Sequence, residues 1–408
     1  MPNHPPSSIL HPLPPNRLLV RGVNWLGDAV MTTPALLRLR EALPDTRITL
    51  LTHEKLADLW THHPAVDSVL TFSARDNPFS IASRLREQRF DAALLLPNSA
   101  RAALEAAIAR IPRRIGYSGG GRSWLLTQAV PRRTDVVTMH KRSEAEIRGL
   151  IAGDSERSAA FRPLQRAEQN SVGSGLKAAL PSPGHHIHHY LHLTAALGAN
   201  PEPLAPRIEV TGDEVTEALR RLAPDSKPGE PAPLFGLVPG AEYGPAKRWP
   251  AERFVAAAVE IHRRTNCRWL LLGGKADAAL CSQIADEAAR VAGTSSTIQR
   301  PASTFTNLAG RTTLRELCAL LRACRVVLTN DTGPMHLAAA VGTPVVALFG
   351  STSPELTGPG LPGGSRHQLL RADAPCSPCF LRECPIDFRC MTGLDVTRVV
   401  EAVTRAAA

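Results

Sequence analysis

The sequence predicts an α/β protein with two doubly wound, Rossmann-like domains that face a central cleft. Short apolar runs of strand length alternate with segments whose apolar residues recur at helical spacing, beginning at residue 17. The alternation lapses beyond about residue 153 and resumes in the second half of the chain. Several strands are followed directly by polar, glycine-containing loops. Because ligands of open parallel sheets bind beyond the carboxyl ends of the strands, these loops are the candidate functional segments.

The first half of the chain contains the expected elements of one parallel sheet. A buried strand over 17–21 leads through the loop 22–27 into a helix from about Asp28 to Leu43, which Pro44 ends. Strands that alternate with helices are typical of a parallel sheet with crossover helices. The later strands are expected near 48–52, 68–71 and 91–96, and the later helices near 55–60, 81–88 and 99–109.

Two stretches interrupt this pattern. Residues 1–16 carry six prolines and no apolar block, so we expect a disordered lead-in rather than a signal peptide. The stretch of about 153–185 is rich in Ser, Gly, Pro, Arg and Gln and is interpreted as a flexible insertion, after which a helix resumes over about 187–197. The expected domains are therefore 17–199 and 200–408.

The second half repeats the rhythm of the first. A helix is expected to begin near Pro250, since proline is favoured in a first turn, and another is expected over 333–341. These elements predict a second Rossmann-like domain. Its strands are expected over 235–238, 268–272, 325–329 and 344–349.

The net charge of +10 is concentrated in the first half, where residues 1–199 carry 24 lysines and arginines against 16 aspartates and glutamates. A basic surface serves solubility or binds an anionic partner such as nucleic acid, anionic lipid or a phosphorylated substrate. An aromatic content of 4% disfavours nucleic acid, because single-strand binding depends on stacking platforms. No stretch approaches the roughly 18–20 consecutive apolar residues of a membrane span. Without an export signal, we expect a cytoplasmic protein.

The loop after the first strand ends in Asp28. Its sequence over 22–28, GVNWLGD, is neither a dinucleotide fingerprint nor a P-loop. Asp28 could serve as a helix cap, where the helix dipole would stabilise the carboxylate. Alternatively, it could be a general base at the cleft that accepts the proton of an attacking hydroxyl.

Polar loops also follow three strands of the second half. In the loop 240–250, GAEYGPAKRWP, the cation Lys247 and helix N-terminal amides could bind a diphosphate; the alternative is a solvated basic loop. After the next such strand, Asp331 could grip sugar hydroxyls while the amides of Thr332 and Gly333 face a phosphate, or Asp331 or Thr332 could only cap the helix. The loop 350–354 could close the same pocket.

Two clusters suggest metal chemistry. Four cysteines near the C-terminus have the ligand number of a closed zinc site, although only the first pair has standard spacing. Reduced structural thiols or a redox-labile cluster are the alternatives. The histidines of the run HHIHH over 185–189, with His192, are interpreted as surface imidazoles rather than metal ligands. The four clustered cysteines are Cys376, Cys379, Cys384 and Cys390.

Taken together, these loops resemble those of glycosyltransferase family 9, the ADP-heptose:lipopolysaccharide heptosyltransferases. The segments 24–34, 239–250 and 330–350 carry the resemblance. The sequence GPAKRWP over 244–250 is similar to the heptosyltransferase II branch, whereas the other two segments are similar to the wider family. The resemblance covers nearly the whole chain from residue 17, apart from the insertion.

This resemblance implies a GT-B fold, with the acceptor on the first domain and the nucleotide sugar ADP-heptose on the second. It also implies inverting transfer without a catalytic metal or other cofactor, although a structural zinc at the cysteines remains an alternative. Asp28 matches the family's proposed base, Lys247 its diphosphate-binding lysine and Asp331 its heptose-contacting aspartate. The other expected donor-binding residues are Arg248, Asp277, Thr332, Gly333 and His336.

The implied acceptor is an anionic glycolipid, the heptosyl-Kdo2-lipid A inner core of lipopolysaccharide, which fits the basic first half. We expect peripheral attachment to the cytoplasmic face of the inner membrane and no nucleic-acid partner. Two alternatives stay open: a GT-B transferase that uses another sugar nucleotide, and a non-catalytic nucleotide-sugar- or glycan-binding protein. The expected acceptor-binding residues are Asn24, Trp25, Arg113 and Arg122.

Overall fold

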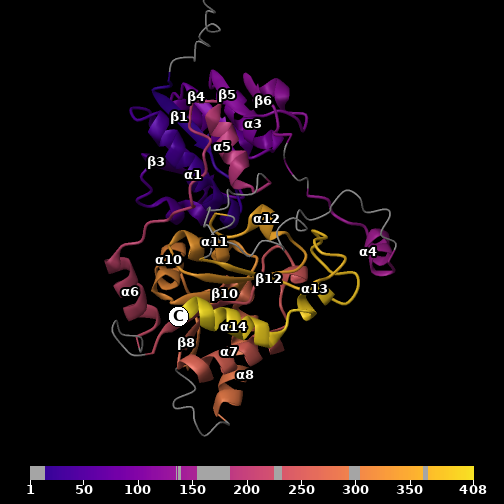
Figure 1. Cartoon of the computed structure of the whole chain (residues 1–408). Helices are drawn as coiled ribbons and strands as arrows, with labels where there is room; N and C mark the ends of the chain where they lie inside the picture. The colour runs from indigo at the N-terminus through magenta and orange to yellow at the C-terminus, as the bar shows by residue number, and fades with distance from the viewer. Residues whose placement is uncertain are drawn as a thin grey trace, which may run out of the picture. The chain divides into compact units, whose positions relative to one another are not determined.

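Each half of the chain forms its own six-stranded parallel sheet in the computed structural model (Figure 1). The structure describes residues 14–134, 136, 139–153, 184–224, 232–293, 304–361 and 366–408. The disordered lead-in and the flexible insertion that we predicted lie almost entirely outside these ranges. The first compact unit comprises Met1–Trp25, Met31–Thr134 and Ile187–Leu204, and the second comprises Leu26–Val30, Asp135–His186 and Ala205–Ala408.

The sheet of the first unit has the strand order β3-β2-β1-β4-β5-β6, the doubly wound order of Rossmann folds. Its central strand β4 is apolar and fully buried, and β1 is buried from Leu18 to Arg21, because helices cover both faces of such a sheet. The strands are β1 Arg17–Arg21, β2 Arg47–His53, β3 Ser68–Phe72, β4 Ala92–Leu95, β5 Arg113–Tyr117 and β6 Gln128–Val130. The helices are α1 Leu26–Ala42, α2 Pro78–Glu87, α3 Ala100–Ile108 and α5 Ile187–Ala195, with the 3₁₀ turns η1 Glu54–Trp60 and η2 Ser123–Leu125.

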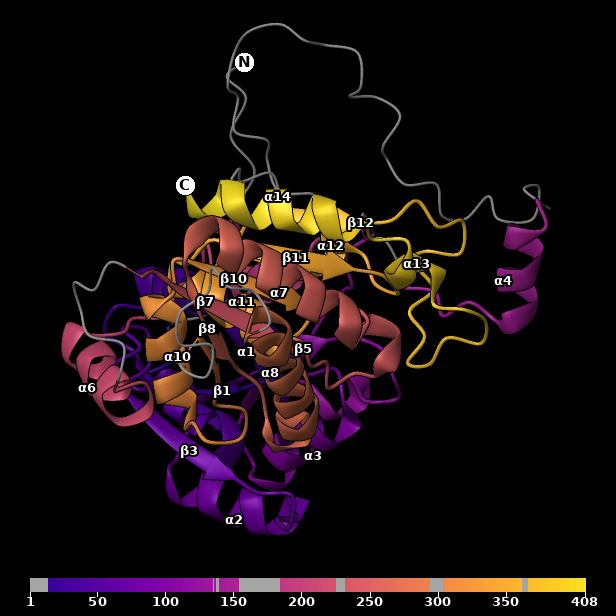
Figure 2. The ribbon, with the colours of Figure 1, turned by 90° about the horizontal axis from the view of Figure 1, so that it is seen from below.

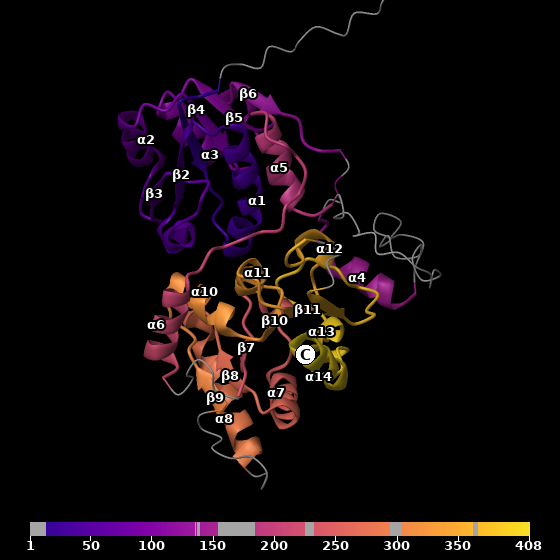
Figure 3. The same cartoon turned by 60° about the vertical axis from the view of Figure 1, so that its left-hand side comes forward.

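The sheet of the second unit has the order β12-β11-β10-β7-β8-β9, which is the same winding as in the first. On one face, α7 lies between α14 and α8 (Figure 2), and α6 lies beside α10 (Figure 3). The strands are β7 Leu234–Val238, β8 Arg268–Leu271, β9 Phe305–Asn307, β10 Val326–Asn330, β11 Val345–Phe349 and β12 Gln368–Arg371. The helices are α4 Glu144–Ile151, α6 Gly212–Leu222, α7 Ala251–Thr265, α8 Ala278–Gly293, α10 Leu314–Ala323, α11 Gly333–Ala340, α12 Pro354–Thr357, α13 Arg389–Thr392 and α14 Val396–Ala407, with the 3₁₀ turns η4 Pro245–Lys247 and η5 Lys275–Asp277.

Local sequence signals start many of these helices. Asn77 and Ser99 cap α2 and α3 through side-chain oxygens that accept first-turn amide hydrogens. Thr211 and Thr313 form capping boxes at α6 and α10, each with a glutamate three residues later. Because α2, α3 and α10 each follow a strand, their first turns lie at the carboxyl edge of their sheet.

The segment with α4 groups with the second unit, whereas our expected boundary placed it in the first domain. Ile147 of α4 is buried in the core of the second unit. The backbone N–H of Arg142 donates to the carbonyl oxygen of Cys379 at 3.1 Å. Across the described ranges, no helix is both long and apolar enough to cross a membrane.

Candidate active site

The strand order reverses between β7 and β10 in the second unit. At such a switch point the loops leaving adjacent strands diverge and open a crevice at the carboxyl edge. The loop after β7 carries Lys247 on η4, and the loop after β10 carries Asp331. The predicted donor loops therefore leave the two strands on either side of the switch point, where open parallel sheets bind their ligands.

Lys247 and Asp331 meet in a largely buried ion pair. The Lys247 ammonium lies 2.6 Å from Oδ2 of Asp331, and the two side chains are 13% and 4% exposed. The hydroxyl of Thr352, from the loop after β11, donates to the same carboxylate oxygen at 2.6 Å. All three predicted strand-exit loops of this unit thus converge on one carboxylate.

Asn330, the last residue of β10, fixes the lysine loop. Its side-chain N–H donates to the carbonyl of Pro239 at 2.7 Å, and its Oδ1 accepts the amide hydrogen of Trp249 at 3.1 Å. One fully buried amide therefore ties both ends of the loop 239–249. The sequence analysis included Asn330 in the segment 330–350 that resembles the family, but it did not predict these two hydrogen bonds.

The residues that follow Cys379 contact the same loop through their backbone carbonyls. The amide of Ala246 donates to the carbonyl oxygen of Arg382 at 2.9 Å, and the Tyr243 hydroxyl donates to that of Phe380 at 2.9 Å. A Cβ on Gly244 would lie 2.4 Å from the Arg382 oxygen, so only glycine permits this approach. The C-terminal segment therefore helps to position Lys247.

The N-terminus of α11 lies beside this ion pair. Thr332 is the N-cap residue, and its side chain makes no capping hydrogen bond. Gly333 opens the helix, and a Cβ there would lie 3.0 Å from the side chain of Leu26. Leu26–Val30, the first turn of α1, groups with the second unit. The amides of α11 and the turn that carries Asp28 are thereby neighbours within this unit.

His186 lies beside Asp28 and also interacts electrostatically with Asp331 of the ion pair. Its Nδ1 lies 4.0 Å from Oδ1 of Asp28, and the side chains are 22% and 30% exposed. Burial lowers the pKa of His186, while the charges of Asp28 and Asp331 act in the opposite direction. Its backbone N–H donates to the carbonyl of Leu356 at 3.0 Å, which holds the residue at the site.

His336, in the first turns of α11, completes the group. It is buried, and burial lowers its pKa to about 4 even though Asp331 raises it. A Cβ on Gly27 would lie 2.8 Å from Cδ2 of this ring, so the turn before Asp28 packs on His336. The site therefore combines two carboxylates, one lysine and two histidines whose burial favours the neutral form.

Arg248 lies in the loop after β7, and Asp277 lies in the turn after the neighbouring strand β8. Nη2 of Arg248 is 4.0 Å from Oδ1 of Asp277 and donates to the carbonyl of Ala241 at 3.3 Å. Asp277 accepts the amide hydrogen of Gly274 at 3.0 Å. Asp277 therefore shapes the turn after β8, and Arg248 extends the basic lining of the loop after β7.

The predicted acceptor-binding residues do not gather in one place in the first unit. Asn24 and the half-exposed Trp25 follow the carboxyl end of β1. Arg113 begins β5 at the opposite, amino-terminal edge and donates to Gln128. Arg122 is 1% exposed and donates to the backbone carbonyl of Tyr117, so its guanidinium holds the loop after β5 together.

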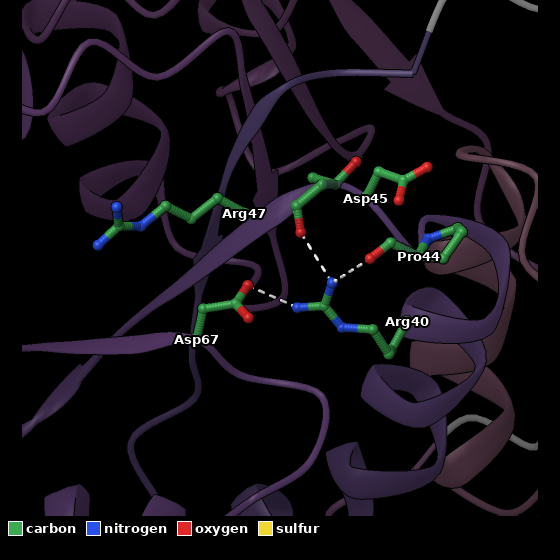
Figure 4. A pocket seen from close by; sticks show the side chains of 6 residues that line it. Arg40, Pro44, Asp45, Arg47 and Asp67 are labelled. Atoms are coloured by element: carbon green, nitrogen blue, oxygen red, sulfur yellow. Dashed lines mark hydrogen bonds and ion pairs between the residues drawn. The ribbon is translucent and has the colours of Figure 1, made fainter.

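Another charged corner lies at that amino-terminal edge. A shallow cavity of about 270 Å³ lies between the end of α1 and the start of β2 (Figure 4). The guanidinium of Arg40 donates to the carbonyls of Pro44 and Thr46 and to the carboxylate of Asp67. These bonds join a helix end to a strand start, at the amino-terminal edge of the sheet of the first unit. Its lining residues are Arg40, Pro44, Asp45, Thr46, Arg47 and Asp67.

The clustered cysteines are packed into the second unit rather than arranged as ligands. Cys376, Cys379 and Cys390 are buried, and burial raises the pKa of Cys390 to about 12. Over the described ranges, which include all four cysteines, no group of three or more His, Cys, Asp or Glu side chains is placed to hold a metal ion. The arrangement fits the alternative of reduced structural thiols.

The interpretation of the histidine run as surface imidazoles is wrong. His185 is fully buried, and its Nε2 shares a hydrogen bond with the carbonyl of Gly358 at 3.1 Å. His192 is half-buried and shares its Nδ1 with the Tyr117 hydroxyl at 2.9 Å. These contacts are tertiary, so the local composition of the run did not reveal them.

Known proteins resemble this chain along most of its length. A family model, Glycosyltransferase family 9 (heptosyltransferase), matches residues 165–388. The lipooligosaccharide heptosyltransferase 2 of Haemophilus ducreyi is 30% identical over 352 residues, which are 84% of this chain and 86% of that protein.

Two solved structures share the fold. The E. coli ADP-heptose LPS heptosyltransferase II has a TM-score of 0.69 at 24% identity and covers 96% of this chain and 98% of its own. A family 9 glycosyltransferase from Veillonella parvula has a TM-score of 0.71 at 20% identity and covers 96% and 97%. The predicted GT-B fold, with two Rossmann-like domains, is confirmed.

Proposed function

Because the chain belongs to glycosyltransferase family 9, the heptosyltransferases, we propose that it moves heptose from ADP-heptose to the heptosyl-Kdo2-lipid A inner core of lipopolysaccharide, with inversion. The observation that carries the proposal is the convergence of Lys247, Asp331 and Thr352 at the switch point of the second sheet. A buried ammonium beside a helix N-terminus is suited to the diphosphate of a nucleotide sugar.

In the proposed donor complex, Lys247 and the first-turn amides of α11 bind the diphosphate. As the bond between the anomeric carbon and the diphosphate oxygen breaks, its electron pair leaves with ADP. Positive charge and amide dipoles fixed in advance stabilise this developing charge without reorganising during the reaction. Asp331 orients the lysine through the 2.6 Å contact and offers its carboxylate to the heptose hydroxyls.

Asp28 is the proposed general base. The acceptor hydroxyl oxygen forms the new bond to the anomeric carbon, and its proton moves to the Asp28 carboxylate. Attack on the face opposite the departing diphosphate inverts the anomeric centre. His186, 4.0 Å from Asp28, acts as a positioning residue that holds this carboxylate.

The remaining donor and acceptor contacts follow from placement. Arg248 and Asp277, at the exits of β7 and β8, are the proposed contacts to the rest of the donor; the 4.0 Å distance between their charged groups supports a shared role. Asn24 and Trp25, at the carboxyl end of β1, are the candidate acceptor contacts. The anionic acceptor is a lipid, so we propose that the enzyme works at the cytoplasmic face of the inner membrane.

The direct test is incubation with ADP-heptose and a truncated lipopolysaccharide that ends in heptosyl-Kdo2-lipid A. Mass spectrometry should show the gain of one heptose, and ADP but not UDP should raise the melting temperature of the protein. Transfer to Kdo2-lipid A that lacks the first heptose would contradict the proposed acceptor. Absence of transfer with either acceptor, despite stabilisation by ADP, would contradict the proposed reaction.

A further inference from the structure

Exposed aromatic side chains gather at one edge of the first unit. Within the described part of this unit, the large hydrophobic side chains that are exposed are Trp25, Phe79 and Trp124, at 48%, 69% and 78%. They follow the carboxyl ends of β1, β3 and β5 respectively. Because the strands of the sheet are parallel, the loops after β1 and β3 belong to the same edge. The connection from β5 to β6 is tied to this edge next to Trp124, where the guanidinium of Arg122 donates to the carbonyl of Ser99, the cap of α3, at 3.3 Å. An edge with three exposed aromatic groups indicates an interaction surface.

Trp124 is held outward by a rigid loop. It is the central residue of η2, and the following residues Leu125 and Leu126 are buried in the core of the first unit. On the other side, the buried Arg122 guanidinium donates twice to the carbonyl of Tyr117, at 3.1 and 3.0 Å. The preceding Gly119–Gly121 have φ angles of +102°, +62° and +67°, which glycine adopts readily. The exposure of Trp124 is therefore imposed by ordered backbone on both sides.

The indole of Trp124 has its single donor already satisfied. Its Nε1–H donates to the carbonyl of Gly121 at 2.9 Å. The exposed part of the side chain is therefore mostly the apolar face and edge of the ring. Such a group gains most from an apolar or interfacial environment, and tryptophan is enriched where water meets the lipid bilayer.

Cationic side chains lie near the same loop. Arg132 is exposed, donates to the carbonyl of Ser118 at 3.2 Å, and its Nη2 would lie 3.5 Å from a Cβ on Gly119. Arg101, on α3, is 45% exposed. Both Arg101 and the buried Arg21 form ion pairs with the buried Glu105, so the three side chains together carry a net charge of +1. Helix α3 contacts η2. Basic residues around an exposed tryptophan are complementary to anionic lipid headgroups.

We propose that the loop of residues 118–134, with Trp124 at its tip, binds the surface of a bilayer that contains anionic lipids. Trp124 enters the interfacial layer, and Arg132 and Arg101 contact the headgroup phosphates. The proposal deepens the proposed function, because a lipid-linked acceptor would be met at this surface. Binding to the bilayer itself requires neither donor nor acceptor, so it can be measured separately from transfer.

The test is co-sedimentation of the full chain with vesicles that contain no glycolipid acceptor. We expect binding to phosphatidylglycerol–phosphatidylcholine vesicles, weaker binding at high salt, and little binding to phosphatidylcholine alone. Trp124→Ala should weaken binding at least fivefold, and Arg132→Gln should reduce the dependence on salt. The matched control Val291→Ala, which changes an exposed apolar residue on α8 of the second unit, should bind like the wild type.

Fluorescence at saturating vesicle concentration gives a second readout, which reports whether the indole lies in the bilayer. Brominated lipids should quench part of the wild-type tryptophan emission, and this part should be missing in Trp124→Phe, which keeps an aromatic ring and the fold. Wild-type protein that ignores anionic vesicles, or quenching that is the same in Trp124→Phe, would overturn the proposal.

Transfer to a deacylated, water-soluble acceptor separates the bilayer from the acceptor sugar. We expect Trp124→Ala to leave this rate unchanged while it slows transfer to acceptor embedded in vesicles. Equal losses on both acceptors would overturn the proposal by assigning Trp124 to the sugar. If the wild type transfers nothing but still binds anionic vesicles through Trp124, the proposed function fails and the surface stands.

Discussion

Replacement of Lys247 by methionine should weaken ADP binding by about 10- to 150-fold. Methionine keeps most of the length and apolar stem of lysine but removes the ammonium. A hydrogen bond to a charged group contributes about 1.5–3 kcal/mol, and each 1.4 kcal/mol is about a factor of ten in affinity. The Lys247 ammonium is only 13% exposed, so solvent screens its interaction with a diphosphate little.

The same change should lower the free energy of unfolding. Removing one partner of a buried ion pair costs about 3–5 kcal/mol because the other charge stays buried. Asp331 keeps the Thr352 hydroxyl at 2.6 Å, and the lysine is partly exposed, so we expect a loss nearer about 2–3 kcal/mol. The variant should therefore be folded, which urea unfolding can verify before any binding measurement.

Isothermal titration calorimetry with ADP measures the affinity directly. The control is Arg322→Met, which removes an exposed cation at the end of α10 in the same unit and should leave the dissociation constant within twofold of the wild type. A folded Lys247→Met variant that binds ADP as tightly as the wild type would refute the assignment of the diphosphate site.

Two further predictions concern the histidines. His186→Gln should lower kcat by about tenfold with little change in ADP affinity, because it removes the imidazole that lies 4.0 Å from Asp28 and positions this carboxylate; a variant whose kcat stays within twofold of the wild type would exclude this positioning role. The second concerns stability: the pKa of His336 is lowered from 6.5 to about 4, so between these values the unfolded chain binds the proton that the native state excludes. The free energy of unfolding should therefore fall as the pH drops from about 6.5, with a loss on the order of 3 kcal/mol complete near pH 4, and urea titrations of His336→Gln should show a shallower fall.

The central strands were predictable because each contains a run of at least three consecutive apolar residues. β1, β10 and β11 are buried on both faces, and their runs of Val, Leu and Ala exclude an exposed element. The strands that sequence reasoning missed, β5, β6, β9 and β12, are partly exposed and lie at or near sheet edges. Their patterns are short and mixed, since an edge strand does not need two apolar faces.

The position of the proposed donor loops was predictable for a related physical reason. Lys247 and Asp331 follow buried parallel strands, so the sequence alone predicts that both lie at the carboxyl edge of the sheet. His186 precedes α5, and its backbone N–H donates to the carbonyl of Leu356, a tertiary contact that no local pattern encodes. Arg113 and Arg122 are close in sequence but lie at opposite ends of β5, because the direction of the strand separates them.

The rate of heptose transfer by Asp28→Asn, at saturating donor and acceptor, tests the central claim most directly. Asparagine keeps the size and polarity of the side chain but cannot accept the proton. We expect kcat to fall by about 10²- to 10⁴-fold, as for loss of a general base, while ADP affinity stays within twofold of the wild type. A variant that transfers heptose within tenfold of the wild-type rate would contradict the assignment of Asp28 as the base.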